Sequence, residues 1–412
     1  MPHDEYDVIV VGAGAAGLAA ASRLASTTLR FLVLEARDRP GGRGWTCEIG
    51  GGHSVDLGCG WLHSADRNPF VAIAEQQGRR IDKSPPPWGR AAAQVGPNRA
   101  RMAAFGEAIG RLRERVEALP LDASDIACDA LLDPDEPCNP LIDAVSTYYR
   151  GAELAKISAR DLALYEDSGV NWRVREGYGA VIAALAHGLP IRTSCPVRAI
   201  DRSGATLQVE TEAGAIRSRA AIVTLPSDVL AQTPDLFRPA LPDKIQAALD
   251  LPLGLADKLY MELIEPLDLP EDSRAFGAID RRATAAYHFR PLGRPLIEAY
   301  FGGELADSLE LGGAAAAFDF ALGELIGLFG ADFRRRVRPL RFHGWRADVF
   351  ARGSYSYARP GCAASRARLL APVENRLFFA GEACSRERYS TAHGAYETGL
   401  NAADAAALAL AR

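Results

Sequence analysis

No two of the seven cysteines form a Cys-x-x-Cys pair, so the chain lacks the ligand spacing of a zinc ribbon. Because the number of cysteines is also odd, we expect free thiols in a reducing compartment rather than a disulfide framework. Residues 1–5 are acidic where a secretory signal is basic. A membrane-spanning helix needs about 20 consecutive, mostly apolar residues. No run of that length in this sequence is free of both charge and glycine. These absences predict a cytoplasmic protein without a membrane segment.

A strong excess of either charge is missing as well. The 47 lysines and arginines and the 52 aspartates and glutamates are interspersed and leave a net charge of −5. Neither nucleic acid nor a membrane is therefore expected as a partner. The signatures G-x-S-x-G and H-E-x-x-H are absent, and no metal site is expected. At 412 residues, 48% of them hydrophobic, the chain is long enough for two domains.

The N-terminal region carries the clearest functional pattern. A buried strand at residues 7–11 runs into a glycine-rich turn, and a helix over 18–24 and a second strand over 31–34 follow. This order is typical of a dinucleotide-binding unit. The helix N-terminus would direct its unpaired N–H groups at the phosphates.

Three glycines and a carboxylate make this unit specific. Gly12 permits the tight turn, Gly14 allows a pyrophosphate to approach the backbone, and Gly17 allows the helix to pack on the strand. Glu35 follows the second strand, where its carboxylate suits both hydroxyls of an adenosine ribose. A 2′-phosphate, and therefore NADP, is disfavoured there.

Residues 66–176 differ in character from this unit. Prolines stiffen residues 84–88, and a helix expected over 101–119 has its apolar side chains on one face. This largely helical insert is a candidate substrate lid. The buried run 220–225 would then return to the first sheet, so the nucleotide-binding domain is expected to be discontinuous.

A second sheet is expected in the C-terminal half. Within its first segment, residues 253–263, Lys258 lies at the start of an alternating apolar pattern, and a helix over 318–329 follows the sheet. The strands assigned to this sheet are residues 253–263, 276–280, 285–290 and 296–302.

Two further glycine-rich stretches follow. The first, at 343–357, contains Trp345 and Tyr355, and the second, at 376–399, is a buried strand, a turn with Glu382 and a helix start. That helix could direct its N-terminal dipole at another part of the same ligand. A nucleotide unit at one end and a second cofactor-shaped unit at the other suit a long ligand such as FAD.

With these motifs in this order, the sequence resembles the flavin-containing amine oxidase family, which holds monoamine and polyamine oxidases. The resemblance covers most of the chain and is strongest at both ends. It implies FAD bound without a covalent link, because Ser354 stands where covalently flavinylated relatives carry cysteine. The residues assigned to FAD on this basis are Gly12, Gly14, Ala15, Gly17, Glu35, Ala36, Arg37, Gly42, Arg43, Gly60, Trp61, Val197, Trp345, Gly381, Glu382, Thr391, Ala392 and Ala395.

The resemblance also points to residues at the reacting end of the flavin. Lys258 matches a lysine that holds a water near flavin N5, where an ammonium favours developing negative charge. Tyr355 matches one wall of an aromatic cage that orients an amine, and Thr391 stands at the second wall, which is tyrosine in many relatives. His63 is a candidate for bonding substrate or tuning a proton transfer, and the alternative is a hydrogen-bonded core histidine.

The implied activity is that of an FAD-dependent amine oxidase. A primary or secondary amine would transfer a hydride from its α-carbon to flavin N5, the imine would hydrolyse, and O2 would reoxidise the flavin to give H2O2. One alternative is a flavin desaturase or dehydrogenase that acts on a non-amine or an amino acid and uses another electron acceptor. Amino-acid oxidation would need a cation for the carboxylate, and the sequence singles out no arginine. A flavoprotein retained for partner binding is a further alternative.

The expected fold class is α/β, or α+β overall. It combines a discontinuous, Rossmann-like FAD-binding domain with a substrate-binding domain of mixed sheet and helices. The FAD-binding domain is assigned residues 1–76, 177–250 and 344–412, and the substrate-binding domain 77–176 and 251–343.

Overall fold

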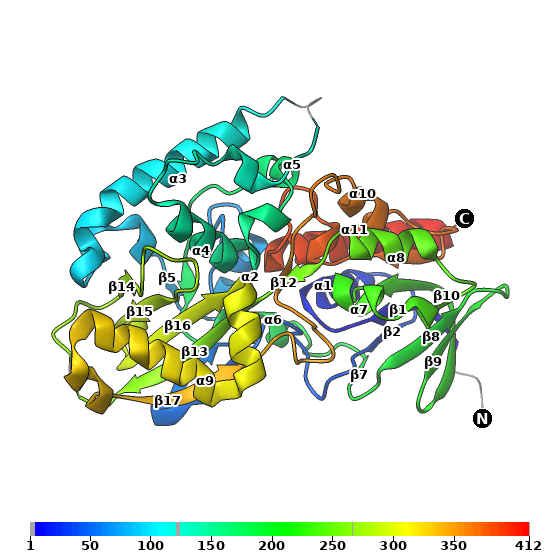
Figure 1. The fold of residues 1–412 in the computed structure, drawn as a ribbon. Helices are drawn as coiled ribbons and strands as arrows, with labels where there is room; N and C mark the ends of the chain where they lie inside the picture. Colours follow the sequence, from blue (N-terminus) through cyan, green and yellow to red (C-terminus); the bar gives the residue numbers. More distant parts are fainter. Residues whose placement is uncertain (1–4, 121–123, 266, 412) are drawn as a thin grey trace.

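The computed structural model describes residues 5–120, 124–265 and 267–411. Two large sheets lie next to each other (Figure 1). The eight-stranded sheet lies near both ends of the chain, and the five-stranded sheet lies beside the long helix α9 (Gly303–Phe329). These sheets and their helices agree with the α/β fold class expected from the sequence.

The eight-stranded sheet brings together distant parts of the chain. Its order is β11-β8-β9-β10-β1-β2-β7, with β19 also paired to β10. At its centre β2, β1, β10 and β19 run parallel. Its strands are β1 (Glu5–Val11), β2 (Phe31–Leu34), β7 (Ile191–Arg192), β8 (Val197–Asp201), β9 (Leu207–Thr211), β10 (Gly214–Val223), β11 (Phe237–Arg238) and β19 (Leu377–Phe379).

Alternate residues of β1 pack into cores on opposite faces of this sheet, as a buried parallel strand requires. Val8 and Val10 share one core with α1 (Ala15–Leu24) and α11 (Ala392–Leu410). Ile9 and Val11 share the other core with residues of the smaller helices on that side. Those helices are α7 (Ser227–Ala231), α8 (Pro242–Leu249) and α10 (Ser365–Leu370).

The five-stranded sheet is antiparallel, in the order β14-β15-β16-β13-β17. Its strands are β13 (Ala256–Leu263), β14 (Ser273–Phe276), β15 (Ala286–Phe289), β16 (Leu296–Gly302) and β17 (Val337–His343). The strand predicted over 276–280 was misplaced, because β14 ends at Phe276. Beyond it the Glu324 carboxylate accepts the backbone N–H groups of Ala278 and Ala285, which ties that segment into a loop.

Helix α9 extends much further than the predicted helix over 318–329. It begins at Gly303 and is broken at Gly313, where φ is 72° and ψ is −169°. Helix α9 is long and apolar enough to cross a membrane, judged by length and composition alone. Core helices of proteins outside membranes meet the same criterion. Its residues Ala306, Ala317 and Leu325 are fully buried in the core shared with the five-stranded sheet.

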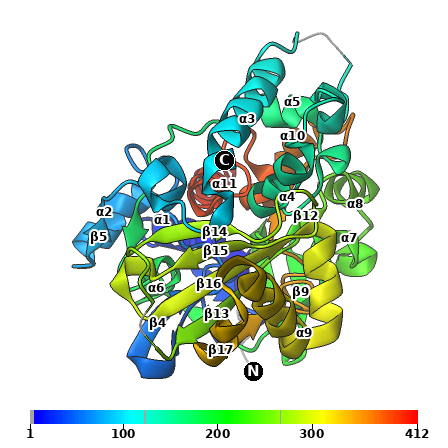
Figure 2. The same cartoon turned by 60° about the vertical axis from the view of Figure 1, so that its left-hand side comes forward.

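The helical insert packs over the edge of the five-stranded sheet (Figure 2). The helix predicted over 101–119 is confirmed as α3 (Met102–Glu117). It shares a core with α4 (Asn139–Arg150) and with Phe276 of β14, and α5 (Ala159–Ala163) follows. The remaining elements are α2 (Pro69–Gln76), α6 (Tyr178–Ala184), β3 (Thr46–Ile49), β4 (His53–Asp56), β5 (Ile81–Asp82), β6 (Arg173–Val174), β12 (Leu253–Gly254) and β18 (Tyr355–Ser356).

Candidate active site

One cavity of about 1500 Å³ runs from the glycine turn to the five-stranded sheet. This exceeds the roughly 300–1,000 Å³ of a typical small-molecule pocket, so the cavity has room for a dinucleotide and a second molecule. Apart from Gly17, every residue proposed from the sequence for FAD or catalysis lines it. These are Gly12, Gly14, Ala15, Glu35, Ala36, Arg37, Gly42, Arg43, Gly60, Trp61, His63, Val197, Lys258, Trp345, Tyr355, Gly381, Glu382, Thr391, Ala392 and Ala395.

Gly17 and Gly14 have different surroundings in the turn. A Cβ atom on Gly17 would lie 1.9 Å from the carbonyl oxygen of Gly12, so Gly17 is needed for α1 to pack. A Cβ atom on Gly14 would meet nothing within 4 Å. Gly14 lines the cavity at the N-terminus of α1, which leaves the space and the unpaired N–H groups that a pyrophosphate needs.

The Glu35 carboxylate is held rigidly at the end of β2. It is 4% exposed, and its oxygens accept the backbone N–H groups of Ala13 at 2.7 Å and Arg37 at 2.8 Å. Each oxygen keeps a further lone pair, so both can accept a ribose hydroxyl. The residues around the turn therefore fit the adenosine end of FAD.

Arg43 pairs with the Glu382 carboxylate. The guanidinium of Arg43 donates to Glu382 at 2.9 Å and to the carbonyl oxygen of Ser354 at 2.8 Å. Glu382 also accepts from the Ser356 hydroxyl at 2.6 Å and the backbone N–H of Ser390 at 3.0 Å. Burial opposes ionisation of Glu382, but Arg43, Ser356 and Arg366 together outweigh it and lower the pKa of Glu382.

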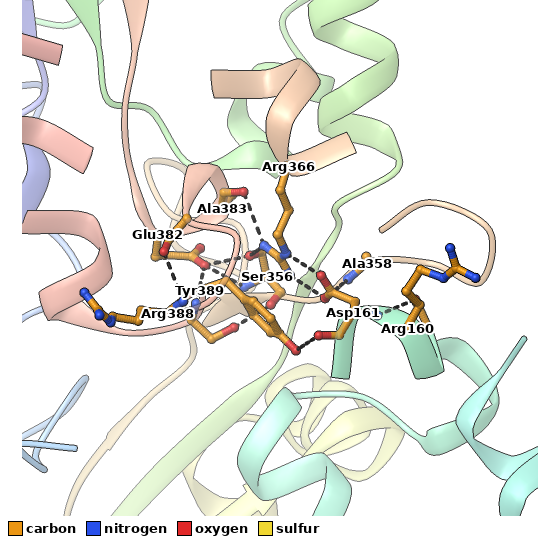
Figure 3. A network of polar contacts seen from close by, with 12 residues as sticks. Arg160, Asp161, Ser356, Ala358, Arg366, Glu382, Ala383, Arg388 and Tyr389 are labelled. Atoms are coloured by element: carbon orange, nitrogen blue, oxygen red, sulfur yellow. Dashed lines mark hydrogen bonds and ion pairs between the residues drawn. The ribbon is translucent and has the colours of Figure 1, made fainter. Parts of the chain in front are cut away.

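A buried ion pair anchors Glu382 to the helical insert (Figure 3). Arg366 donates to the Ser356 hydroxyl at 3.0 Å and binds the Asp161 carboxylate of α5 with two bonds of 2.7 and 2.8 Å. Arg366 also stacks on Tyr389, with 3.7 Å from its guanidinium carbon to the ring centroid. Arg366 and Asp161 are each 1% exposed, so this network fixes Glu382 from outside the cofactor site.

Lys258 lies in β13, and its ammonium uses all three of its donors within the protein. The Nζ atom donates to the carbonyl oxygens of Asp56 and Gly58, both at 2.9 Å, and pairs with Glu298 at 3.2 Å. Burial opposes the charge, but Glu298, Tyr300 and Asp56 together outweigh it and raise the pKa of Lys258. A water held by this ammonium would therefore have to replace one of the three acceptors.

Glu298 begins a chain of alternating charges that leads away from Lys258. His288 Nδ1 lies 3.8 Å from Glu298, and His288 Nε2 lies 2.9 Å from Asp272. Arg173 then joins Asp272 and Asp82, each at 2.6 Å. Although burial favours the neutral carboxyl, Lys258 and His288 lower the pKa of Glu298 to about 2, so it is ionised at neutral pH.

Aromatic hydroxyls meet beside Lys258. The Tyr355 and Tyr300 oxygens are 3.0 Å apart, and Tyr355 also donates to the carbonyl oxygen of Tyr148. The Thr391 hydroxyl caps α11: it donates to the Arg388 carbonyl at 2.6 Å and accepts from the Gly394 N–H at 3.0 Å. The aromatic neighbour of Tyr355 is thus Tyr300, and a catalytic role for Thr391 stays a prediction.

His63 has the surroundings of a hydrogen-bonded core histidine, although it also lines the cavity. Its Nδ1 lies 2.5 Å from the Asn171 side-chain oxygen. Burial lowers the pKa of His63, against the effect of Asn171, and burial lowers the pKa of the nearby His393 to about 3. Both imidazoles are therefore biased toward the neutral form, and a part for His63 in proton transfer stays a prediction.

Sequence reasoning did not single out Glu298, Tyr300, His288 or Arg274, all of which line the cavity. A signal was present for two of them. In the apolar strand over 296–302, Glu298 and Tyr300 are two residues apart and therefore share a face. Two polar groups on one face of a buried strand point to a site rather than to solvent.

Comparison with known proteins identifies the family of the chain. The chain matches the model of the flavin-containing amine oxidoreductase family over residues 15–407. Polyamine oxidase 2 of Arabidopsis thaliana is 30% identical, over 96% of this chain and 87% of the relative. Lysine-specific histone demethylase 1 homolog 2 of Arabidopsis thaliana is also 30% identical, over 97% of this chain but only 58% of that longer relative.

Solved structures of putrescine oxidase share the fold. A double mutant has a TM-score of 0.79 at 20% identity, with 100% of both chains covered. The wild type bound to putrescine has a TM-score of 0.78 at 19% identity, with 99% of both chains covered. The fold and the cavity define a flavoprotein that binds FAD. The chain belongs to the flavin-containing amine oxidoreductase family.

Proposed function

We propose that this protein oxidises a primary or secondary amine to an imine, which hydrolyses to a carbonyl compound and ammonia or an amine, with O2 as the electron acceptor. When bound in the cavity, FAD would supply the two-electron redox chemistry, by which a hydride leaves the α-carbon and the electrons finally reduce O2 to H2O2. The observation that carries the proposal is that Lys258, Glu298, Tyr300 and Tyr355 share one cavity with the dinucleotide turn.

These side chains suit an amine. The rings of Tyr300 and Tyr355 offer π faces that attract a cationic amine before it loses its proton. Glu298, with a pKa of about 2, is a poor base and instead stabilises positive charge in the cavity. The Lys258 ammonium favours negative charge that develops on oxygen nearby. Relatives named as polyamine oxidases, and the putrescine oxidase bound to putrescine, support an amine as the substrate.

The test is anaerobic reduction of the purified holoenzyme by a panel of monoamines, diamines and polyamines. We expect at least one amine to bleach the flavin absorbance and, after air is admitted, to yield one H2O2 for each amine consumed. Bleaching without H2O2 would indicate a dehydrogenase that uses another acceptor. Flavin that no amine bleaches would contradict the proposal and favour a non-amine substrate or a partner-binding role.

A pair of matched variants connects the activity to the cavity. Glu298→Gln removes the charge beside Lys258, so kcat/KM for amines should fall. Glu262→Gln changes the same sheet outside the cavity, where Glu262 pairs with Arg338, and should leave kcat/KM unchanged. Equal effects of the two substitutions would show that the cavity carboxylate has no special part in the reaction.

We also propose a cytoplasmic location. All seven cysteines are free thiols, which suits a reducing compartment. Fractionation of the source cells, with activity and antibody readouts, tests this. Recovery in a membrane or secreted fraction would contradict it.

A further inference from the structure

Arg274 lies on the sheet face that carries Lys258. It pairs with His288 on the next strand, and His288 pairs with Glu298 on the strand after that. The adjacent row of cross-strand partners lies two residues further along the strands and consists of Phe276, Ala286, Tyr300 and Lys258. Cross-strand partners, and residues two apart in a strand, point to the same side of a sheet. Arg274 and Lys258 therefore face the same cavity. Their backbones are three strand spacings apart across the sheet and two residues apart along it, which amounts to about 16 Å.

Every other charge along this face has an opposite partner. Lys258 is paired with Glu298, and His288 lies between Glu298 and Asp272. Arg173 is bracketed by Asp272 and Asp82. With His288 protonated, the cations Lys258, His288 and Arg173 balance the anions Glu298, Asp272 and Asp82. None of these three carboxylates is therefore free to pair with a further cation.

Arg274 is the exception. Among the described residues its guanidinium has no ion pair, and its side-chain contact is with the Phe276 ring, 4.6 Å from guanidinium carbon to centroid. The groups that act on it are the hydroxyls of Tyr148 and Tyr149, and burial lowers the pKa of Arg274. A half-buried cation without an anion is costly unless a ligand supplies one.

The surroundings add to this positive charge. Two arginines, Arg274 and Arg113, act on the Tyr149 hydroxyl together with the anion Asp167. All of these residues line the cavity. The end of the cavity that lies away from Lys258 is therefore biased toward an anionic ligand, whereas Glu298 and the tyrosines beside Lys258 suit an amine.

We propose that Arg274 binds a carboxylate of the substrate, and that the enzyme therefore prefers amino acids whose carboxylate lies several bonds away from the oxidised amine. This inference rests on the proposed amine oxidation. A guanidinium matches a carboxylate with two parallel hydrogen bonds, and the Phe276 ring holds its plane in place. An α-amino acid is too short to reach from Arg274 to the Lys258 end, so the preferred substrate carries its amine at the far end of an alkyl chain.

The test compares straight-chain ω-amino acids of increasing length with alkylamines and ω-aminoalkylphosphonates of the same length. We expect the wild-type enzyme to favour one ω-amino acid over the matching alkylamine by about 10- to 100-fold in kcat/KM, as a charge-assisted bond provides. Arg274→Met should abolish most of this preference, and Arg274→Lys should retain part of it. Arg281→Met is the control: Arg281 pairs with Glu324 outside the cavity, and its loss should leave the preference intact.

A binding measurement separates this inference from the proposed oxidation. Straight-chain alkanoates carry no amine and cannot be oxidised, so their binding to the holoenzyme, followed by the flavin spectrum and by calorimetry, reports on the anion site alone. We expect Arg274→Met to weaken that binding by about 10-fold or more. Oxidation of amines without any carboxylate preference, alkanoate binding that Arg274→Met leaves unchanged, or a preference for the phosphonates would each overturn the carboxylate assignment. Alkanoate binding that depends on Arg274, with no amine oxidised, would instead refute the proposed oxidation.

Discussion

Gly14 and Gly17 lie in one turn, yet replacing them with alanine should produce opposite defects. In Gly17→Ala the new methyl group would lie 1.9 Å from the Gly12 carbonyl oxygen and 2.9 Å from its carbon. Because these are backbone atoms of a buried turn, they cannot move aside without shifting β1 or α1. Overpacking of this kind costs about 1–3 kcal/mol or more, so we expect a loss of stability of at least this size.

Gly14→Ala should leave the stability almost unchanged. The residue has φ of −78° and ψ of −173°, which alanine adopts freely, and its methyl group would meet nothing within 4 Å. The gain of about 0.4–1 kcal/mol from a stiffer unfolded chain is offset by the preference of a helix N-cap for glycine over alanine. The same methyl group would occupy the space for the pyrophosphate, so the Kd for FAD should rise about tenfold or more, equivalent to about 1.4 kcal/mol.

Urea unfolding of the FAD-free proteins and fluorescence titration with FAD measure the two effects separately. Gly323→Ala, in α9 and with nothing within 4 Å of the added methyl group, is the control for both assays. A Gly17→Ala protein as stable as wild type would refute the packing argument. A Gly14→Ala protein that binds FAD normally would refute the placement of the pyrophosphate.

Three further predictions concern the reacting end and the cofactor. Lys258→Met leaves two carbonyls and Glu298 without their cation, so flavin reduction by amines, followed by stopped flow, should slow about 100-fold with FAD content unchanged; reduction at the wild-type rate would contradict a role for the ammonium. The pKa of Glu298 is lowered from 4.5 to about 2, so its share of stability, about 3 kcal/mol, is present above pH 4.5 and lost as the pH falls toward 2. Urea midpoints should therefore fall more steeply over this range in the wild type than in Glu298→Gln, and parallel curves would contradict the linkage. The Ser354 hydroxyl is hydrogen-bonded to the backbone of Ala256, and the position offers no thiol that could bind the flavin covalently. Acid precipitation should therefore release FAD into the supernatant, and flavin that stays in the pellet would indicate a covalent bond.

The nucleotide unit could be predicted from the sequence because its signal is local. Gly12 has a φ of 102°, Gly17 packs against the carbonyl oxygen of Gly12 in the same turn, and Glu35 follows the adjacent strand. The strand over 276–280 was misplaced because the deciding contact is distant: Glu324 reaches back from α9 to hold the backbone of Ala278. The proposed domain boundaries stay a prediction.

The charges of the cavity needed the structure for the same reason. Arg274 is one of many arginines, and nothing in its neighbouring residues distinguishes it from Arg173. The difference is that Asp272 and Asp82 bracket Arg173 while no carboxylate pairs with Arg274 among the described residues, and this depends on strand pairing. Likewise, Tyr300 was missed as the neighbour of Tyr355 because the two residues are 55 positions apart.

The contact between α1 and α11 has a consequence for how the protein is made. A Cβ atom on Gly399 would lie 2.1 Å from the Ala16 carbonyl oxygen, so the two helices touch along their backbones, and both contribute to the core beneath β1. During translation α1 leaves the ribosome several hundred residues before α11. Until then the apolar side of the first glycine unit is uncovered, and the nascent chain is exposed to aggregation. FAD loading should therefore follow the completion of synthesis, and fragments that stop before α11 should be recovered as insoluble protein without flavin.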